Sequence, residues 1–402
     1  MAVDPQEPYP GHSLQPDIPA LFGMILLPSG TYVGVENYQD SLPPHSLDVV
    51  LVGEVVYLSG NFIMGAARHE GSPRSDSGSP SREENPQDEY AGELDYSADS
   101  DYVEEFASDT TSLNSMITAY RYENGRRYHA YRDGAYWGPN DEMQNEQLDI
   151  AHHMFTMLLG DKLCLAPISD NIQRVLDVDE YPSAEVIGTD LSPTQPTFVP
   201  PNLRFEVDDA EDSWAYPENH FDLIHVRSLY GAISNWPAFY RNMMIGLRPG
   251  GWFDQLEMSI EFRSDDDTVT YDHILAEWSR IFIDAGERFG KTFRICDLAR
   301  DYMLDVGFEN VTERRFKLPV GPWTRDEHYR KLGMWNLLHC EKGIEGWAMA
   351  LLTRVMGWSY EEVQIFLASM RRGLRDYSRI HAYFYVVSVY GQKPLKGHNA
   401  DK

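Results

Sequence analysis

The sequence of 402 residues contains little cysteine. Its three cysteines, Cys164, Cys296 and Cys340, are scattered and show none of the spacings typical of a metal site. Such sparse usage is typical of a reducing compartment. We therefore expect a cytoplasmic or nuclear protein without a metal centre.

Long apolar runs are also missing. No uninterrupted stretch approaches the ~20 residues that span a bilayer. The most apolar N-terminal run, residues 18–27, is short and follows Asp4, Glu7 and Asp17 rather than basic residues, which argues against a signal peptide. We expect a soluble protein with no membrane partner.

Positive charge is scarce. Lys and Arg number 34 against 63 Asp and Glu, which gives a net charge of -29. Because phosphate contacts need clustered Lys and Arg, this balance argues against direct nucleic-acid binding. Residues 82–109 hold eleven acids and one base, a composition that predicts a disordered segment.

Composition predicts four parts of the chain. They are an N-terminal extension of unknown structure at 1–67, an acidic Ser/Pro-rich disordered segment at 68–117, a folded domain at 118–392 with a helical insertion at about 322–379, and a tail at 393–402.

Strand and helix patterns alternate through the folded domain, which predicts an α/β fold with a mostly parallel sheet. Short apolar runs predict strands at 174–178, 185–190, 203–207, 221–226, 252–260, 311–318 and 382–390. Helical spacing covers 147–159, and Ser359 with Glu362 forms a capping box. Asp297 can cap a helix that ends before Gly307, and the Pro-Gly-Gly at 249–251 predicts a turn.

Polar side chains follow several of these strands. Asp177 and Asp190 end the first two, Asp209 and Ala210 follow the third, and His225 and Arg227 end the fourth. Carboxyl ends of parallel strands meet at one edge of a sheet, where nucleotides bind. Asp190 could accept hydrogen bonds from ribose hydroxyls, Leu191 could pack on a base, and Asp209 could accept the exocyclic amine of adenine beside the Ala210 amide. The alternative for each acid is a helix cap.

Aromatic and basic residues crowd the stretch from 120 to 142, which includes Tyr128 and His129. This stretch could pack on the domain as an amphipathic cap, or close over a ligand. His129 and His225 are candidates to accept a proton from a substrate. A structural histidine is the alternative for both.

The motifs ENGRRYHAYR, VLDV, AEVIGTDLSP, FEVDDAED, FDLIHVRSL and LRPGGWFDQLE together resemble the class I S-adenosylmethionine-dependent methyltransferases of fungi, in the LaeA-like group of secondary-metabolism regulators. The resemblance covers roughly residues 115–390. It implies a Rossmann-like, seven-stranded sheet with an antiparallel last strand, S-adenosyl-L-methionine as cofactor, and a small-molecule or protein methyl acceptor. The candidate cofactor-binding residues are then Asp177, Asp190, Leu191, Asp209, Ala210, Arg227 and Tyr128, and the catalytic candidates are His129 and His225.

One motif of the family is missing. Members read VLDVGTGTGIWAIDFA at the first strand, whereas this chain passes from Val178 directly to Asp179. Six residues, 179–184, cannot provide the usual helical crossover of ~10–12 residues between parallel strands. Either the two strands cannot pair in the usual way, or the chain is a truncated product of a gene with complete transcripts. A clean loss between matching flanks favours a splicing or gene-model difference.

Three functions remain open. The first is a methyltransferase whose activity is impaired by the missing glycine loop. The second is a non-catalytic regulatory protein that keeps the scaffold and binds a protein partner. The third, an NAD-dependent oxidoreductase, also needs a Gly-rich turn and leaves LRPGGWFDQLE unexplained.

Overall fold

The computed structural model describes residues 117–168, 173–176, 184–195, 199–212, 214 and 216–395, and the backbone of two short strands nearer the N-terminus. The chain divides into two compact units, Met1–Ser46 and Leu47–Lys402. In the first unit, β1 (Gly23–Leu26) pairs antiparallel with β2 (Tyr32–Val35). The acidic segment expected to be disordered lies almost wholly outside the described residues, so the proposed domain boundaries stay predictions. In the described part of the chain, no helix is both long and apolar enough to cross a membrane.

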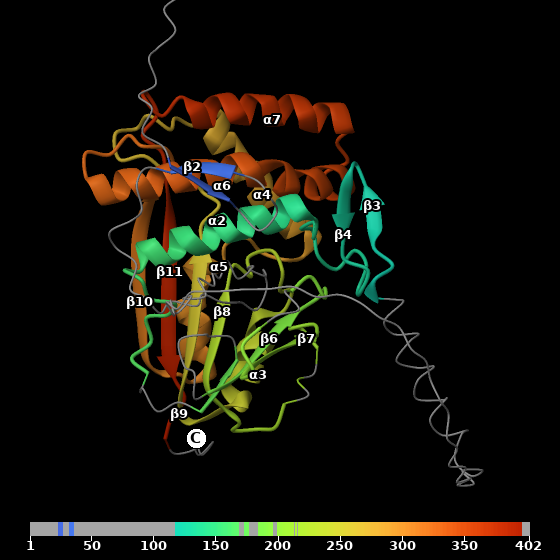
Figure 1. Ribbon diagram of the computed structural model, residues 1–402, viewed down its shortest axis with the longest axis vertical. Helices are drawn as coiled ribbons and strands as arrows, with labels where there is room; N and C mark the ends of the chain where they lie inside the picture. Colours follow the sequence, from blue (N-terminus) through green and yellow to red (C-terminus); the bar gives the residue numbers. More distant parts are fainter. Residues whose placement is uncertain are drawn as a thin grey trace, which may run out of the picture. The chain divides into compact units, whose positions relative to one another are not determined.

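A seven-stranded sheet forms the centre of the second unit, with the order β10-β11-β9-β8-β5-β6-β7 (Figure 1). β11 runs antiparallel to β9 and β10, and the other pairs are parallel. The strands are β5 (Arg174–Leu176), β6 (Glu185–Asp190), β7 (Leu203–Val207), β8 (Phe221–Arg227), β9 (Leu247–Met258), β10 (Glu309–Pro319) and β11 (Tyr383–Gln392). The predicted Rossmann-like fold with an antiparallel last strand is therefore confirmed.

The shortened connection between β5 and β6 still allows the two strands to pair. They run parallel, with Arg174 opposite Glu185 and Leu176 opposite Ile187. Leu176 of β5 is level with Ile187, whereas β6 begins two residues earlier, at Glu185. From Leu176 the chain must therefore run back by two residues, ~7 Å, and move ~4.8 Å sideways to the neighbouring strand. Eight residues reach ~25 Å when extended, so residues 177–184 can close this gap. Of the two alternatives that the sequence left open, the less favoured one, in which the two strands cannot pair, is therefore wrong.

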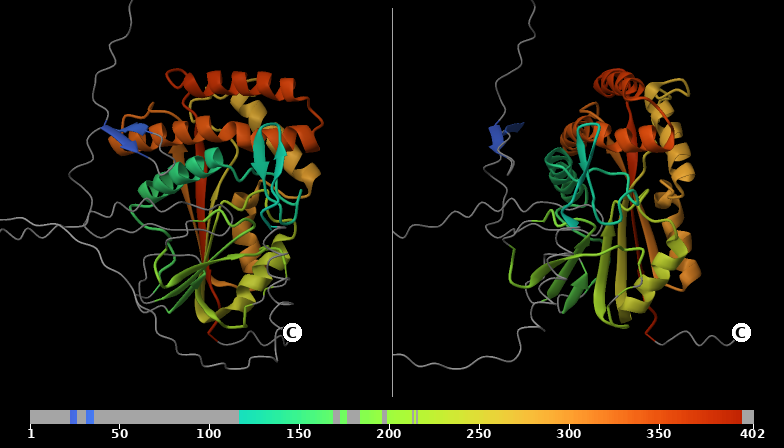
Figure 2. Two further views of the ribbon diagram at one scale, coloured as in Figure 1. Left: turned by 45° about the vertical axis from the view of Figure 1, so that its right-hand side comes forward. Right: turned by 90° about the vertical axis from the view of Figure 1, so that its right-hand side faces the viewer.

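Helices cover both faces of the sheet, as the right-hand view of Figure 2 shows. α3 (Trp236–Gly246) and α5 (Ile295–Val306) pack on one face, where the Tyr240 hydroxyl donates to Gln255 at 2.6 Å. α2 (Glu142–Leu158) lies over the other face, with Phe155 against Arg227. The remaining helices of this unit are α4 (Ile274–Phe289), α6 (Glu327–Ala350), the π-helix η1 (Leu351–Val355) and α7 (Tyr360–Arg375).

Three local signals in the sequence were placed inaccurately. α2 begins five residues before the predicted start, because Asp141 caps it by accepting from the Gln144 amide. Asp297 does not cap α5; it lies inside the helix and pairs with Arg315 at 2.8 Å.

The Pro-Gly-Gly stretch lies within β9 rather than in a turn before it, at a register shift between Phe221 and Leu223 of β8. A Cβ on Gly251 would lie 2.9–3.1 Å from the carbonyl oxygens of Arg248, Phe221 and Asp222, so this bulge requires glycine.

The capping box of α7 is present as predicted. The Ser359 hydroxyl accepts from the Glu362 amide at 3.2 Å, and the Glu362 carboxylate accepts from the Ser359 amide at 2.8 Å. These bonds satisfy amides that the first turn of a helix leaves without partners.

We predict that Ser359→Ala lowers the free energy of unfolding by about 1 kcal/mol, because the cap is lost. Ser369→Ala is the matched control, since Ser369 lies inside the same helix, where its hydroxyl donates to the Ile365 carbonyl and accepts from the exposed side chain of Arg372. Alanine there should be neutral or slightly stabilising. Urea unfolding of both variants measures the difference, and equal effects would contradict the capping role.

Candidate functional site

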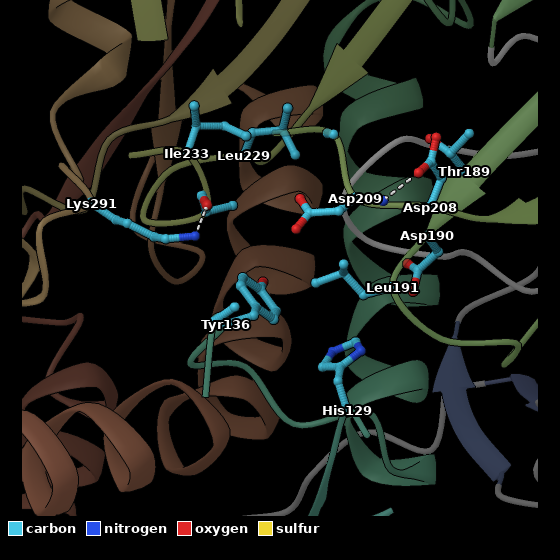
Figure 3. A pocket seen from close by; sticks show the side chains of 13 residues that line it. His129, Tyr136, Thr189, Asp190, Leu191, Asp208, Asp209, Leu229, Ile233 and Lys291 are labelled. Carbon is cyan, nitrogen blue, oxygen red and sulfur yellow. Dashed lines mark hydrogen bonds between the residues drawn. The ribbon is translucent and has the colours of Figure 1, made fainter. Parts of the chain in front are cut away.

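A cavity opens at the carboxyl ends of β6 and β7, beside the loop that follows β8 (Figure 3). Its empty space, including the part open to solvent, is about 540 Å³. Five residues named from the sequence line it: His129, Asp190, Leu191, Asp209 and Ala210. The remaining lining residues are Ala135, Tyr136, Thr189, Asp208, Leu229, Ala232, Ile233 and Lys291.

Asp190, the last residue of β6, places a carboxylate at the cavity. One oxygen accepts from the Ser192 amide at 2.7 Å. Burial raises the pKa of Asp190 to about 7, and the single backbone hydrogen bond only partly offsets this effect. A carboxylate in this state is stabilised by further hydrogen-bond donors.

A buried polar chain fixes His129 beside Asp190. Asn140 donates to the Ser192 hydroxyl at 2.9 Å, and that hydroxyl lies 2.6 Å from Nδ1 of His129. Burial, with a contribution from Arg127, lowers the pKa of His129 to about 4, so the ring is neutral at pH 7. Because the Ser192 hydroxyl accepts from Asn140, we assign it as the donor of the hydrogen bond to Nδ1 of His129. The proton of the neutral ring then lies on Nε2. In this tautomer His129 can donate a hydrogen bond at Nε2 but cannot take a proton there.

Asp209 reaches the cavity from the loop after β7. One of its oxygens accepts from the Glu211 amide at 3.0 Å, and the other lies 3.7 Å from Nε of Arg132. Arg132 also pairs with Asp212, which ties the 129–138 loop to this wall. Leu191, Ala210 and Ile233 supply apolar surface around the carboxylate. The cavity thus combines three carboxylates, those of Asp190, Asp208 and Asp209, with apolar walls.

Lys291 joins two loops that form the cavity wall. Its ammonium lies 2.6 Å from Glu211 and also donates to the Ala232 carbonyl. The Glu211 carboxylate in turn accepts from the amide and hydroxyl of Ser234. Burial alone would raise the pKa of Glu211, but the hydrogen bonds from Lys291 and Ser234 hold it below its usual range. We call Lys291, Glu211 and Ser234 the loop bracket.

Comparison with known proteins supplies the family. Residues 169–313 match the family described as methyltransferase domain. Methyltransferase pytC of Aspergillus terreus is 36% identical over 301 residues, which covers 71% of this chain and 92% of that protein. The protein-methionine methyltransferase laeA of Emericella nidulans is 35% identical over 303 residues, covering 71% and 79%. The secondary metabolism regulator LAE1 of Cochliobolus heterostrophus is 35% identical over 279 residues, covering 65% and 91%.

The chain belongs to the LaeA-like class I methyltransferases. This family is S-adenosylmethionine-dependent, as the sequence motifs implied. Its cofactor edge, the carboxyl ends of the parallel strands, coincides with the cavity.

Other candidate residues lie away from the cavity in this LaeA-like chain. His225 is 2% exposed, and its Nδ1 lies 2.9 Å from Asp254. Asp254 also accepts from the amides of Leu165 and Ala166, both at 3.1 Å. His225 therefore holds a buried carboxylate in place, which is the structural alternative considered for it.

Arg227 and Tyr128 are also buried and do not line the cavity. The Arg227 guanidinium lies 5.3 Å from the centre of the Phe155 ring. The Arg354 guanidinium lies over the Tyr128 ring, 4.3 Å from the centre of that ring. Burial raises the pKa of the Tyr128 hydroxyl to about 12. Asp177 lies outside the described residues.

Several residues at the site were not named as candidates from the sequence. Ser192 follows the Asp190-Leu191 pair directly and could have been named from its position. Lys291 lies about a hundred positions along the chain, between α4 and α5, and no local pattern marks it. Glu257 is buried and accepts from the amides of Leu229 and Tyr230 at 3.1 and 3.2 Å. It thereby fixes the loop after β8.

We predict that His225→Ala lowers the free energy of unfolding by about 2–3 kcal/mol, because buried Asp254 loses a donor. Its affinity for S-adenosyl-L-homocysteine should change by less than about twofold, as binding does not involve that face of β8. His129→Ala should do the reverse, with about tenfold weaker binding and little loss of stability. Urea unfolding and calorimetric titration test both variants, and weaker binding in His225→Ala at unchanged stability would contradict the assignment.

We also predict that Lys291→Met weakens binding of the same ligand about tenfold, because the loop bracket no longer fixes the cavity wall. Lys291→Arg should restore most of the affinity. Lys342→Met is the matched control: Lys342 makes a comparable pair with Glu146 at 2.9 Å, and neither residue lines the cavity. Equal affinities for the two methionine variants would show that the bracket does not position the site.

Proposed function

We propose that the cavity binds the adenosine part of S-adenosyl-L-methionine, and that the chain serves methyl transfer to a small-molecule or protein acceptor. The observation that carries the proposal is that Asp190 and Asp209 line one apolar-walled cavity at the ends of neighbouring parallel strands. Asp190 would accept hydrogen bonds from the ribose hydroxyls. Leu191 would pack on the base, and Asp209, with the Ala210 amide, would recognise its edge.

The residues present fit the two ends of the cofactor unequally. The adenosine end meets carboxylates and apolar side chains. For the amino-acid end, the sequence has no glycine from Arg174 to Ile187, so the close backbone approach that glycines permit is missing. Eight residues between β5 and β6 also leave no room for a crossover helix whose first amides could bind a carboxylate. S-adenosyl-L-methionine would supply an activated methyl group when bound, but these residues define no complete arrangement for its transfer.

The acceptor and partners are proposals of the same kind. A small molecule or a protein is supported by the names of the relatives, one a methyltransferase and another a protein-methionine methyltransferase. A cytoplasmic or nuclear location agrees with the three cysteines, which are all free thiols.

A second candidate function is a non-catalytic regulatory protein that keeps the methyltransferase scaffold and binds a protein partner. The eight-residue connection between β5 and β6, which contains no glycine, favours it, because such a connection lacks the glycine turn and the crossover helix of the family motif. Methyl transfer from radiolabelled S-adenosyl-L-methionine to extract proteins and small molecules distinguishes the two functions.

We predict that adenosine binds about tenfold more tightly at pH 8 than at pH 6. Ribose hydroxyls donate to the ionised form of Asp190, whose pKa near 7 leaves most molecules protonated at pH 6. Binding therefore favours loss of a proton and strengthens as the pH rises. Adenosine itself has no group that titrates in this range.

Calorimetric titration at pH 6, 7 and 8 measures this effect, with Asp190→Asn as the control. The variant should bind more weakly, and its affinity should not vary with pH. If the unmodified chain binds no adenosine at millimolar concentration, the proposed function fails.

A further inference from the structure

The connection from β5 to β6 is short and contains no glycine: eight residues, 177–184, lie between Leu176 and Glu185. Leu176 is level with Ile187 of β6 and with Ile224 of β8. A connection of this length and composition provides neither a glycine turn nor a crossover helix whose first amides would face a group attached to the ribose 5′ carbon.

Positive groups do not compensate for this loss. Lys291 lines the cavity, but Glu211 and the Ala232 carbonyl occupy its ammonium. Arg132 is paired with Asp212 and Asp209. Arg227 is buried against Phe155 and does not line the cavity.

Negative groups dominate the cavity instead. Asp190, Asp208 and Asp209 all line it. A ligand carboxylate or phosphate would face these acids without a counter-charge from the described residues. Neutral hydroxyl and amine donors suit the same acids well.

We infer that this cavity is selective for adenine ribonucleosides as a class, that it does not distinguish 5′ substituents that carry no net negative charge, and that it disfavours anionic ones. The inference rests on the proposed function, since it uses the same adenosine contacts. It goes further in assigning no binding contribution to the amino-acid part of S-adenosyl-L-methionine. The chain would bind adenosine, 5′-methylthioadenosine and S-adenosyl-L-homocysteine almost equally.

Calorimetric titration of the full chain at pH 8 with a series of nucleosides tests the inference. Adenosine, 5′-methylthioadenosine, S-adenosyl-L-homocysteine and S-adenosyl-L-methionine should bind within about fivefold of one another. Adenosine 5′-monophosphate should bind at least about tenfold more weakly, because its phosphate meets the three acids. 2′-Deoxyadenosine should also lose about tenfold, since it lacks a hydroxyl for Asp190.

The outcomes separate the inference from the function on which it rests. If no member of the series binds, the proposed function fails and the inference fails with it. If S-adenosyl-L-homocysteine binds more than about fivefold tighter than adenosine, the proposed function stands and the inference is overturned. Tight binding of the monophosphate would overturn it as well.

A matched variant tests the cause of the selectivity. Inserting the family segment GTGTGIWAIDFA between Val178 and Asp179 should leave adenosine affinity unchanged and strengthen S-adenosyl-L-homocysteine binding at least about thirtyfold. Circular dichroism and thermal unfolding establish whether the variant folds. A folded variant that gains equally for both ligands, or for neither, would contradict the inference. The nucleoside series on the unmodified chain decides the question if the variant does not fold.

Discussion

The reach of eight residues between Leu176 and Glu185 is the constraint on which this structure depends. A helical crossover is the usual way to join parallel neighbours, and the chain is too short to form one. Parallel pairing is possible because the register leaves the chain only a small distance to return, with Leu176 opposite Ile187. β5 therefore lies between β6 and β8 in the order β10-β11-β9-β8-β5-β6-β7.

The segment that follows α2 packs on the sheet at β6, β7 and β8. Leu163, Cys164 and Ile168, which follow α2, pack with Val186, Leu203 and Leu223. The segment is held by the two amides that donate to Asp254, and His225 holds the same carboxylate from the other side. Burial of that charge is tolerated because both oxygens are satisfied. His225 thus contributes to covering the sheet rather than to the cavity.

The cavity itself is built by elements that the missing segment does not touch. The Asn140–Ser192–His129 chain fixes its floor, the loop bracket joins the loops after β7 and β8, and Glu257 holds the start of the second of these loops. Each of these contacts joins segments far apart in the sequence. Under the proposed function, a loss confined to one crossover would remove the approach to the 5′ end of a ligand and leave the residues proposed to bind adenosine in place.

The sequence predicts this site unevenly, for a physical reason. Strand ends on one edge of a sheet converge, so Asp190, Leu191, Asp209 and Ala210 could be grouped from their positions alone. The same rule could not separate them from His225 and Arg227, because β8 is buried on both faces and its pattern does not reveal which face meets the ligand. Lys291 acts through a long-range contact, which no local pattern encodes.

Two carboxylates of this fold differ in how completely the protein supplies them with hydrogen-bond donors. Asp254 receives a bond from a histidine and two from backbone amides, which completes its coordination inside the protein. Among the described residues, one donor, the Ser192 backbone amide, bonds to the Asp190 carboxylate, and burial raises the pKa of Asp190 to about 7. A buried carboxylate with too few donors is costly to keep ionised. The hydroxyls of a ribose would supply the missing donors, so the same shortage that destabilises the ionised group in the free protein favours the bound ligand.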